Sequence, residues 1–153
     1  MQLVVTNTPV LVTRAVVAGM TEVVRATVAG VYSALRTSSC TTVHDIEATL
    51  DALHVRTDVE LIGAMLSDMG EAHHATCTRV CLEHMHCALA ALNLALTQLD
   101  AAVRRRSFLS ALYASSVDTA LLTRLRECKA DLDHHFRRLI EVEGLVAAVG
   151  GRA

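Results

Sequence analysis

Proline, tryptophan and the other aromatic residues are scarce in this chain. Its 153 residues include one proline, seven glycines, two phenylalanines, two tyrosines and no tryptophan. Proline and glycine punctuate strands and turns, so their scarcity argues against a fold of short strands joined by tight turns. The composition favours long helices.

A long uncharged segment is also missing. The longest stretch without Asp, Glu, Lys or Arg runs from His84 to Leu99 and still contains Asn93 and Gln98. It is shorter than the ~20 apolar residues that a membrane-spanning helix needs. The N-terminal apolar run lacks a basic segment before it and is interrupted by Arg14, which argues against a signal peptide. We therefore expect a soluble, intracellular (cytoplasmic) protein without a membrane partner.

The chain carries no strong excess of charge and no motif that names an activity. Its net charge is −2, whereas nucleic-acid-binding domains are usually strongly basic, so we expect no nucleic-acid partner. Neither a glycine-rich phosphate loop nor a serine-centred nucleophile elbow is present in the sequence. We therefore expect no catalytic residues and a protein that is not an enzyme.

Cysteine is present in an odd number. The five cysteines are Cys40, Cys77, Cys81, Cys87 and Cys128. In a chain of this length, a spread of cysteines over helical segments is typical of reduced thiols that act as small apolar residues. This pattern predicts a reducing compartment.

The residues that are abundant predict an all-α fold. Apolar residues make up 52% of the chain, and its length fits a single domain spanning residues 1–153. The first helix is expected to begin at Thr8-Pro9, where Thr8 caps it, and to fade near residue 37. Its inward face is predicted to include Val12, Val16, Met20, Val23, Val24, Val28, Val31 and Leu35, with Arg14, Thr21, Glu22 and Arg25 opposite.

A broken helical segment is predicted at about residues 43–69. One helix begins near Thr42, and a second begins at Thr57, which together with Glu60 has the spacing of a capping box. Gly70 either ends the second helix or lies inside a longer one, because one glycine costs only ~1 kcal/mol in a helix interior.

Two longer helices complete the predicted fold. The first runs from Glu71 to Arg106 and the second from about Ser116 to Val149. Three long helices with a broken segment between the first two predict an antiparallel helical bundle. The predicted inward residues of these two helices are Cys77, Cys81, Met85, Ala88, Leu89, Leu92, Leu96, Leu99 and Val103, followed by Leu121, Leu125, Cys128, Leu132, Phe136, Leu139 and Val146.

A cluster of histidine and cysteine residues between 73 and 87 is the strongest candidate for a metal site. His73, Cys77, Cys81 and His84 share one helical face, and thiolate and imidazole are ligands of zinc- or copper-like ions. One straight helix cannot wrap four ligands around one ion, so Cys128 or His135 of the last helix would have to contribute. The alternative is that the cysteines fill the core and the histidines lie at its edge.

The first helix is the candidate interface. Val10, Val17, Val24 and Val28 widen its apolar face beyond what two neighbouring helices would cover. Large exposed apolar patches are rare on monomers, so these valines indicate contact with a protein, either a second copy or a larger assembly. The alternative is that the segment 43–69 covers them within one chain.

Two hypotheses for function follow from these patterns. The first is a non-enzymatic helical-bundle protein with a structural or interaction role, self-associating or a small subunit of a larger assembly, with no cofactor. The second is a bundle that binds a metal ion or small ligand through the cluster at 73–87. The sequence alone leaves both open.

Overall fold

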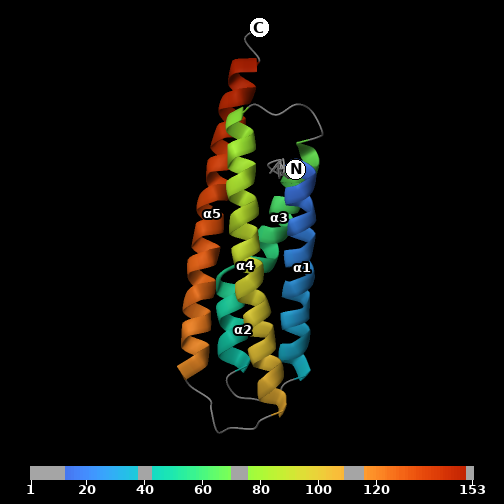
Figure 1. Ribbon diagram of the computed structural model, residues 1–153, viewed down its shortest axis with the longest axis vertical. Coiled ribbons are helices and arrows are strands. Elements are labelled where there is room, and N and C mark those ends of the chain that lie inside the picture. The colour runs from blue at the N-terminus through green and yellow to red at the C-terminus, as the bar shows by residue number, and fades with distance from the viewer. Residues whose placement is uncertain (1–12, 38–42, 70–75, 109–115, 151–153) are drawn as a thin grey trace, which may run out of the picture.

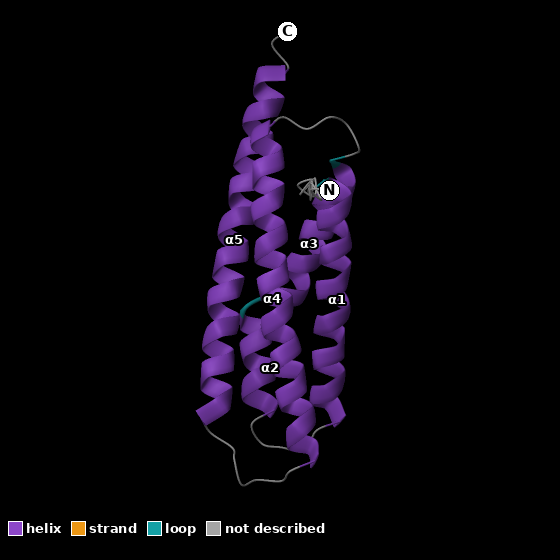
Figure 2. Ribbon diagram, in the orientation of Figure 1, coloured by secondary structure: helices purple, strands orange, loops and turns teal. Residues whose placement is uncertain are grey.

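The computed structural model describes residues 13–37, 43–69, 76–108 and 116–150, and every regular element within these ranges is a helix (Figure 2). The all-α prediction is therefore confirmed. The helices are α1 (Arg14–Thr37), α2 (Val43–Ala52), α3 (Val55–Asp68), α4 (Thr76–Phe108) and α5 (Ser116–Gly150).

The helices lie along one common axis as an antiparallel bundle (Figure 1). In that view α1 runs down, α2 and α3 run up in succession, α4 runs down and α5 runs up. The predicted arrangement of three long helices with a broken segment between the first two is therefore confirmed.

The central helix of the bundle is α4, which packs against α1 on one side and α5 on the other, while α1 also packs against α3. Although α1 and α4 are separated in sequence, they are parallel neighbours. At their middle, the Thr27 hydroxyl donates a hydrogen bond of 2.7 Å to Oδ1 of Asn93. The bundle is thus built from two helical hairpins whose first helices lie against each other.

One hydrophobic core runs through the bundle, and α4 contributes its largest share. The buried side chains of α4 recur at the spacing of one helical face, as a helix covered by two neighbours requires. They are Leu82, Met85, Ala88, Leu89, Leu92, Ala95, Leu96, Leu99 and Val103. The predicted inward residues of α4 from Met85 to Val103 are therefore correct.

The upper end of α4 differs from the prediction. Cys77, which was expected to point inward, is exposed, and Thr78 and Leu82 occupy the core position instead. The hydroxyl of Thr78 donates a hydrogen bond of 2.8 Å to Oε1 of Glu143 on α5. Because that bond satisfies the hydroxyl, threonine can be buried where the sequence pattern favours cysteine.

The inward face of α1 is rotated relative to the prediction. Thr21 was expected on the polar side but is buried, and its hydroxyl donates to the Val17 carbonyl oxygen at 2.9 Å. Val23 was expected inward but is 48% exposed. A threonine whose hydroxyl bonds to the preceding turn presents only its methyl group to the core, so counting it as polar misplaces the face.

The break between α2 and α3 occurs at His54, which has a positive φ of 53°. The backbone N–H of Asp58 donates to the His54 carbonyl oxygen at 2.9 Å, so α3 begins before the predicted capping box at Thr57. Val55 and Val59, one turn apart, are both buried in the core. Their burial favours a helix that starts two residues earlier than the capping pattern indicates.

Three boundary predictions concern residues outside the described ranges. These are the start of the first helix at Thr8-Pro9, the start of the second near Thr42, and the break at Gly70. The described helix before Gly70 ends at Asp68, and the described helix after it begins at Thr76. The predicted start of the last helix near Ser116 is correct.

The side of the bundle between α3 and α5 is held by a buried lysine. Lys129 is the only lysine of the chain, and its side chain is 2% exposed. Its Nζ donates to Oδ2 of Asp58 on α3 at 2.6 Å and to Oδ1 of Asp133 on α5 at 2.5 Å. Since α3 and α5 are not a closely packed pair, this long side chain spans the distance between them.

The two carboxylates differ from the ammonium in their access to water. The side chains of Asp58 and Asp133 are 31% and 44% exposed. Asp58 also lies in the first turn of α3, where the positive end of the helix dipole favours a negative charge. A buried ammonium depends on such partners, because an unpaired charge in the interior costs several kcal/mol.

Removing both carboxylates should therefore destabilise the fold more than removing the lysine. We expect Asp58→Ala with Asp133→Ala to lower the free energy of unfolding by ~3–5 kcal/mol, since the ammonium is left buried without a partner. Lys129→Met keeps the apolar stem and leaves two carboxylates that water can reach. It should therefore lower the free energy of unfolding by a clearly smaller amount. Urea unfolding followed by circular dichroism measures both, and a larger loss for Lys129→Met would contradict this account.

Candidate functional site

Four of the five residues predicted to bind metal lie in the described part of the chain, and these four do not gather around one point. His73 lies outside the described residues. On α4, Cys77 and His84 are exposed and Cys81 is half-buried, while Cys128 is half-buried on α5. Within the described ranges, no three His, Cys, Asp or Glu side chains are placed to share an ion. The described members of the predicted cluster therefore do not supply a three-ligand centre.

The two half-buried thiols are held in their protonated form. Burial raises the pKa of Cys81 above its ordinary value, and the neighbouring Cys77 raises it further. Burial likewise raises the pKa of Cys128, although Arg124 partly opposes the shift. Because the thiolate is the metal ligand and the nucleophile, both shifts make these cysteines weaker in either role.

The structure instead brings together two histidines from adjacent helices. The ring centroids of His84 on α4 and His135 on α5 are 5.1 Å apart, with the ring planes inclined at 49°. Nε2 of His135 lies 3.4 Å from Oδ1 of Asp131, one turn earlier on α5. The sequence indicates His135 only as a possible partner for the cluster at 73–87. Residue spacing within one helix cannot show which turn of α5 faces His84.

Two shallow grooves flank this histidine pair. One, of about 270 Å³, is lined by Glu83, His84, Cys87, Ala88, Asp131 and His135. The other, of about 290 Å³, is lined by Val80, Cys81, His84, His134, His135 and Arg138. The first groove therefore carries two carboxylates and the second an arginine, so their charges are opposite.

The predicted interface on α1 is corrected by the structure. Val17 and Val24 are fully buried and Val28 is 2% exposed, while Val10 lies outside the described residues. α1 is covered by α4 and by α3, which belongs to the segment 43–69. The alternative explanation of the wide apolar face is therefore correct for these three valines, which are core residues.

Exposed apolar side chains occur elsewhere, and the most exposed lie at the end of α5. Leu145 and Val149 are 67% and 75% exposed and are four residues apart, so they share one face of the helix. Among the residues that the structure describes, the other large apolar side chains with substantial exposure are Val23, Leu61, Val80, Leu94 and Ile140.

The C-terminal end of α5 and the described start of α4 are not level with each other. Thr78, two residues after the start of α4, is already hydrogen-bonded to Glu143 of the antiparallel α5. The remaining turns of α5 extend past the start of α4, as Figure 1 shows at the C-terminal end. By this register Leu145 lies level with Thr76, the first described residue of α4, and Val149 lies beyond it.

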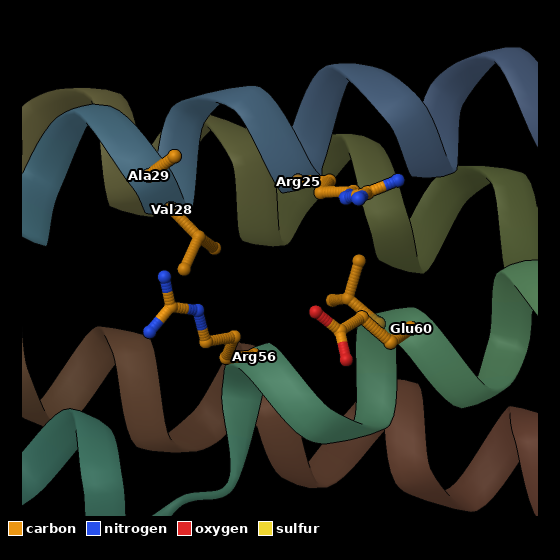
Figure 3. Close-up of a pocket in the computed structure, with 6 residues that line it drawn as sticks. Arg25, Val28, Ala29, Arg56 and Glu60 are labelled. Carbon is orange, nitrogen blue, oxygen red and sulfur yellow. The ribbon is translucent and has the colours of Figure 1, made fainter.

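A third groove, between α1 and α3, is lined by charged and apolar residues (Figure 3). It has a volume of about 200 Å³ and contains Arg25, Val28, Ala29, Arg56, Val59 and Glu60. The Arg56 guanidinium lies 5.2 Å from the centre of the Tyr32 ring, and Arg25 is 3.6 Å from Glu22. These contacts are typical of a solvated charged surface, and they stabilise it only slightly.

Beside this groove, Tyr32 is held as a structural donor. Its hydroxyl donates a hydrogen bond of 2.5 Å to Oδ1 of Asp51 on α2. Burial and this bond raise the pKa of Tyr32 well above its ordinary value. The phenol therefore remains protonated and ties α1 to α2.

Two helices satisfy the length and composition of a membrane span: α1 and the part of α4 from Thr76 to Arg105. In the most apolar window of each, 33% and 39% of the residues are buried within the bundle. Core helices of soluble proteins pass the same test, so this observation is weak evidence for a membrane location. The intracellular location expected from the sequence therefore stays a prediction.

Comparison with protein-family models, with curated proteins and with solved structures finds no match to this chain. The sites above are therefore interpreted from their own geometry.

The raised pKa values predict a difference in thiol reactivity. At about pH 7.5, in the presence of a chelator, Cys81 and Cys128 should react with iodoacetamide clearly more slowly than the exposed Cys77 and Cys87. Each unit of raised pKa lowers the thiolate fraction about tenfold, and burial also limits access. Peptide mapping by mass spectrometry gives each rate. Equal rates at all four thiols in the folded protein would contradict the assignment.

Proposed function

We propose that this chain is a non-enzymatic helical-bundle protein that acts by contact, and that its contact surface is the end of α5. The observation that carries the proposal is the exposure of Leu145 and Val149, 67% and 75%, in the last turns of α5. Unlike the buried valines of α1, these two side chains form a surface that a partner can reach.

The end of α5 is apolar beyond the two most exposed residues. Its last turns also contain Val142 and Val146, both half-buried, and no basic residue follows Arg138 within the helix. A fully buried Leu or Val side chain contributes ~1.5–3 kcal/mol relative to an exposed one. Covering this end therefore contributes favourable free energy to association.

A second copy of the chain is the occupant we propose. Most soluble oligomers are symmetric dimers, in which each contact occurs twice. A strip of two large side chains per copy then buries four such side chains when two α5 ends meet. This doubling lets a short apolar strip support association.

The titratable groups of the described residues support a structural role. Lys129 is tied to two carboxylates, Tyr32 is held protonated by Asp51, and the half-buried thiols have raised pKa values. These arrangements stabilise helix contacts and lower chemical reactivity. The free thiols of the described cysteines also accord with the reducing, intracellular location proposed from the sequence.

Substitution at the end of α5 should dissociate the oligomer. We expect Leu145→Glu with Val149→Glu to weaken self-association by at least ~100-fold, because two charges per copy would have to be buried. Sedimentation velocity over a range of protein concentrations, on the reduced full-length chain, measures the effect. Because both residues are exposed, circular dichroism should show unchanged helicity.

Leu61→Glu is the matched control, because Leu61 is 55% exposed but lies on α3. It should leave the association unchanged. A wild-type chain that remains monomeric at high concentration would contradict self-association. An oligomer unaffected by the double substitution, or dissociated by Leu61→Glu, would place the interface elsewhere.

A further inference from the structure

The groove lined by Glu83, His84, Cys87, Ala88, Asp131 and His135 has the chemistry of a metal site. Five of these six side chains are of types that bind metal ions. They come from two helices that pack closely, α4 and α5, so their relative positions are fixed by the bundle core beneath them. Leu82 and Leu132, which are fully buried, lie on those same helices.

The separation of the two imidazole rings fits a shared ion. In a tetrahedral site each imidazole nitrogen lies ~2.0–2.1 Å from the metal, and the ring centre lies about 1 Å further out, which places two ring centres ~5 Å apart. The observed separation between His84 and His135 is 5.1 Å. Binding would therefore require rotation of the rings, not movement of the helices.

Asp131 orients one of the two ligands. Its Oδ1 lies 3.4 Å from Nε2 of His135, and a hydrogen bond formed there when the ring rotates would hold the proton on that nitrogen. The lone pair is then on Nδ1, which is left to bind the ion. A carboxylate on the far nitrogen is the usual outer partner of a metal-bound histidine.

Charge distinguishes the two grooves beside the histidine pair. Glu83 and Asp131 line one groove, whereas Arg138 lines the other. A cation is attracted to the first and repelled by the second. No third protein ligand is placed to complete the site among the described residues, so water would fill the remaining positions.

We propose that His84 and His135 bind one divalent transition-metal ion of the zinc or copper class in the groove lined by Glu83 and Asp131, and that the ion links α4 to α5. The donor set is two imidazoles with an orienting carboxylate. Cys77, Cys81 and Cys128 do not contribute, which separates this site from the cluster predicted from the sequence.

Titration of the reduced, chelator-treated full-length chain with zinc chloride tests the proposal. Isothermal calorimetry should show one zinc ion per chain, and zinc should raise the melting temperature because the two histidines are held close together only in the folded chain. His84→Asn and His135→Asn should each weaken binding at least tenfold and abolish the rise in melting temperature. Asp131→Asn should weaken binding ~10–100-fold through the orientation of His135.

His134→Asn and Cys81→Ala are the matched controls. His134 neighbours His135 in sequence and contacts its ring, but it lines only the groove that contains Arg138. Both variants should bind zinc as the wild type does. Absence of zinc binding at millimolar zinc, unchanged binding in His84→Asn and His135→Asn, or loss of binding in Cys81→Ala would each overturn the proposal.

Discussion

The bundle depends on the burial of α4 from two sides. Its apolar face is too wide for a single neighbour, and α1 and α5 together cover it. This requirement places two helices that are far apart in sequence, α1 and α4, side by side and parallel. The hydrogen bond between Thr78 and Glu143 fixes the axial register of α5 against α4, and the last turns of α5 extend past the start of α4. The histidine pair and the exposed end of α5 are both consequences of that pairing.

The sequence predicts the helices well where the apolar pattern is long and regular. The core positions of α4 from Met85 onward and the start of α5 are examples. It fails where a polar side chain is satisfied by a nearby backbone or a distant partner. Thr21 and Thr78 are buried because their hydroxyls are hydrogen-bonded. Placing Thr21 on the polar side, and leaving Thr78 out of the inward face, rotates the inferred faces of α1 and α4. His54 adopts a positive φ that no local pattern indicates.

The candidate sites were less predictable than the fold, because they depend on pairings between helices. The valines of α1 look excessive only until α3 is known to cover them. His135 meets His84 because of the register between α4 and α5, which spacing within either helix does not contain. Lys129 could have been singled out as the only lysine of the chain. Its partner Asp58 lies 71 residues away on a helix that α5 does not pack against closely.

We propose that the contact surface of this protein is the end of α5 and not the apolar face of α1. Amide hydrogen exchange of the reduced chain, compared at low and high protein concentration, tests it most directly. Our account predicts that protection of residues 141–150 rises with concentration, while protection of Arg14–Thr37 does not change. Protection of 141–150 that is independent of concentration, or a rise confined to α1, would contradict it.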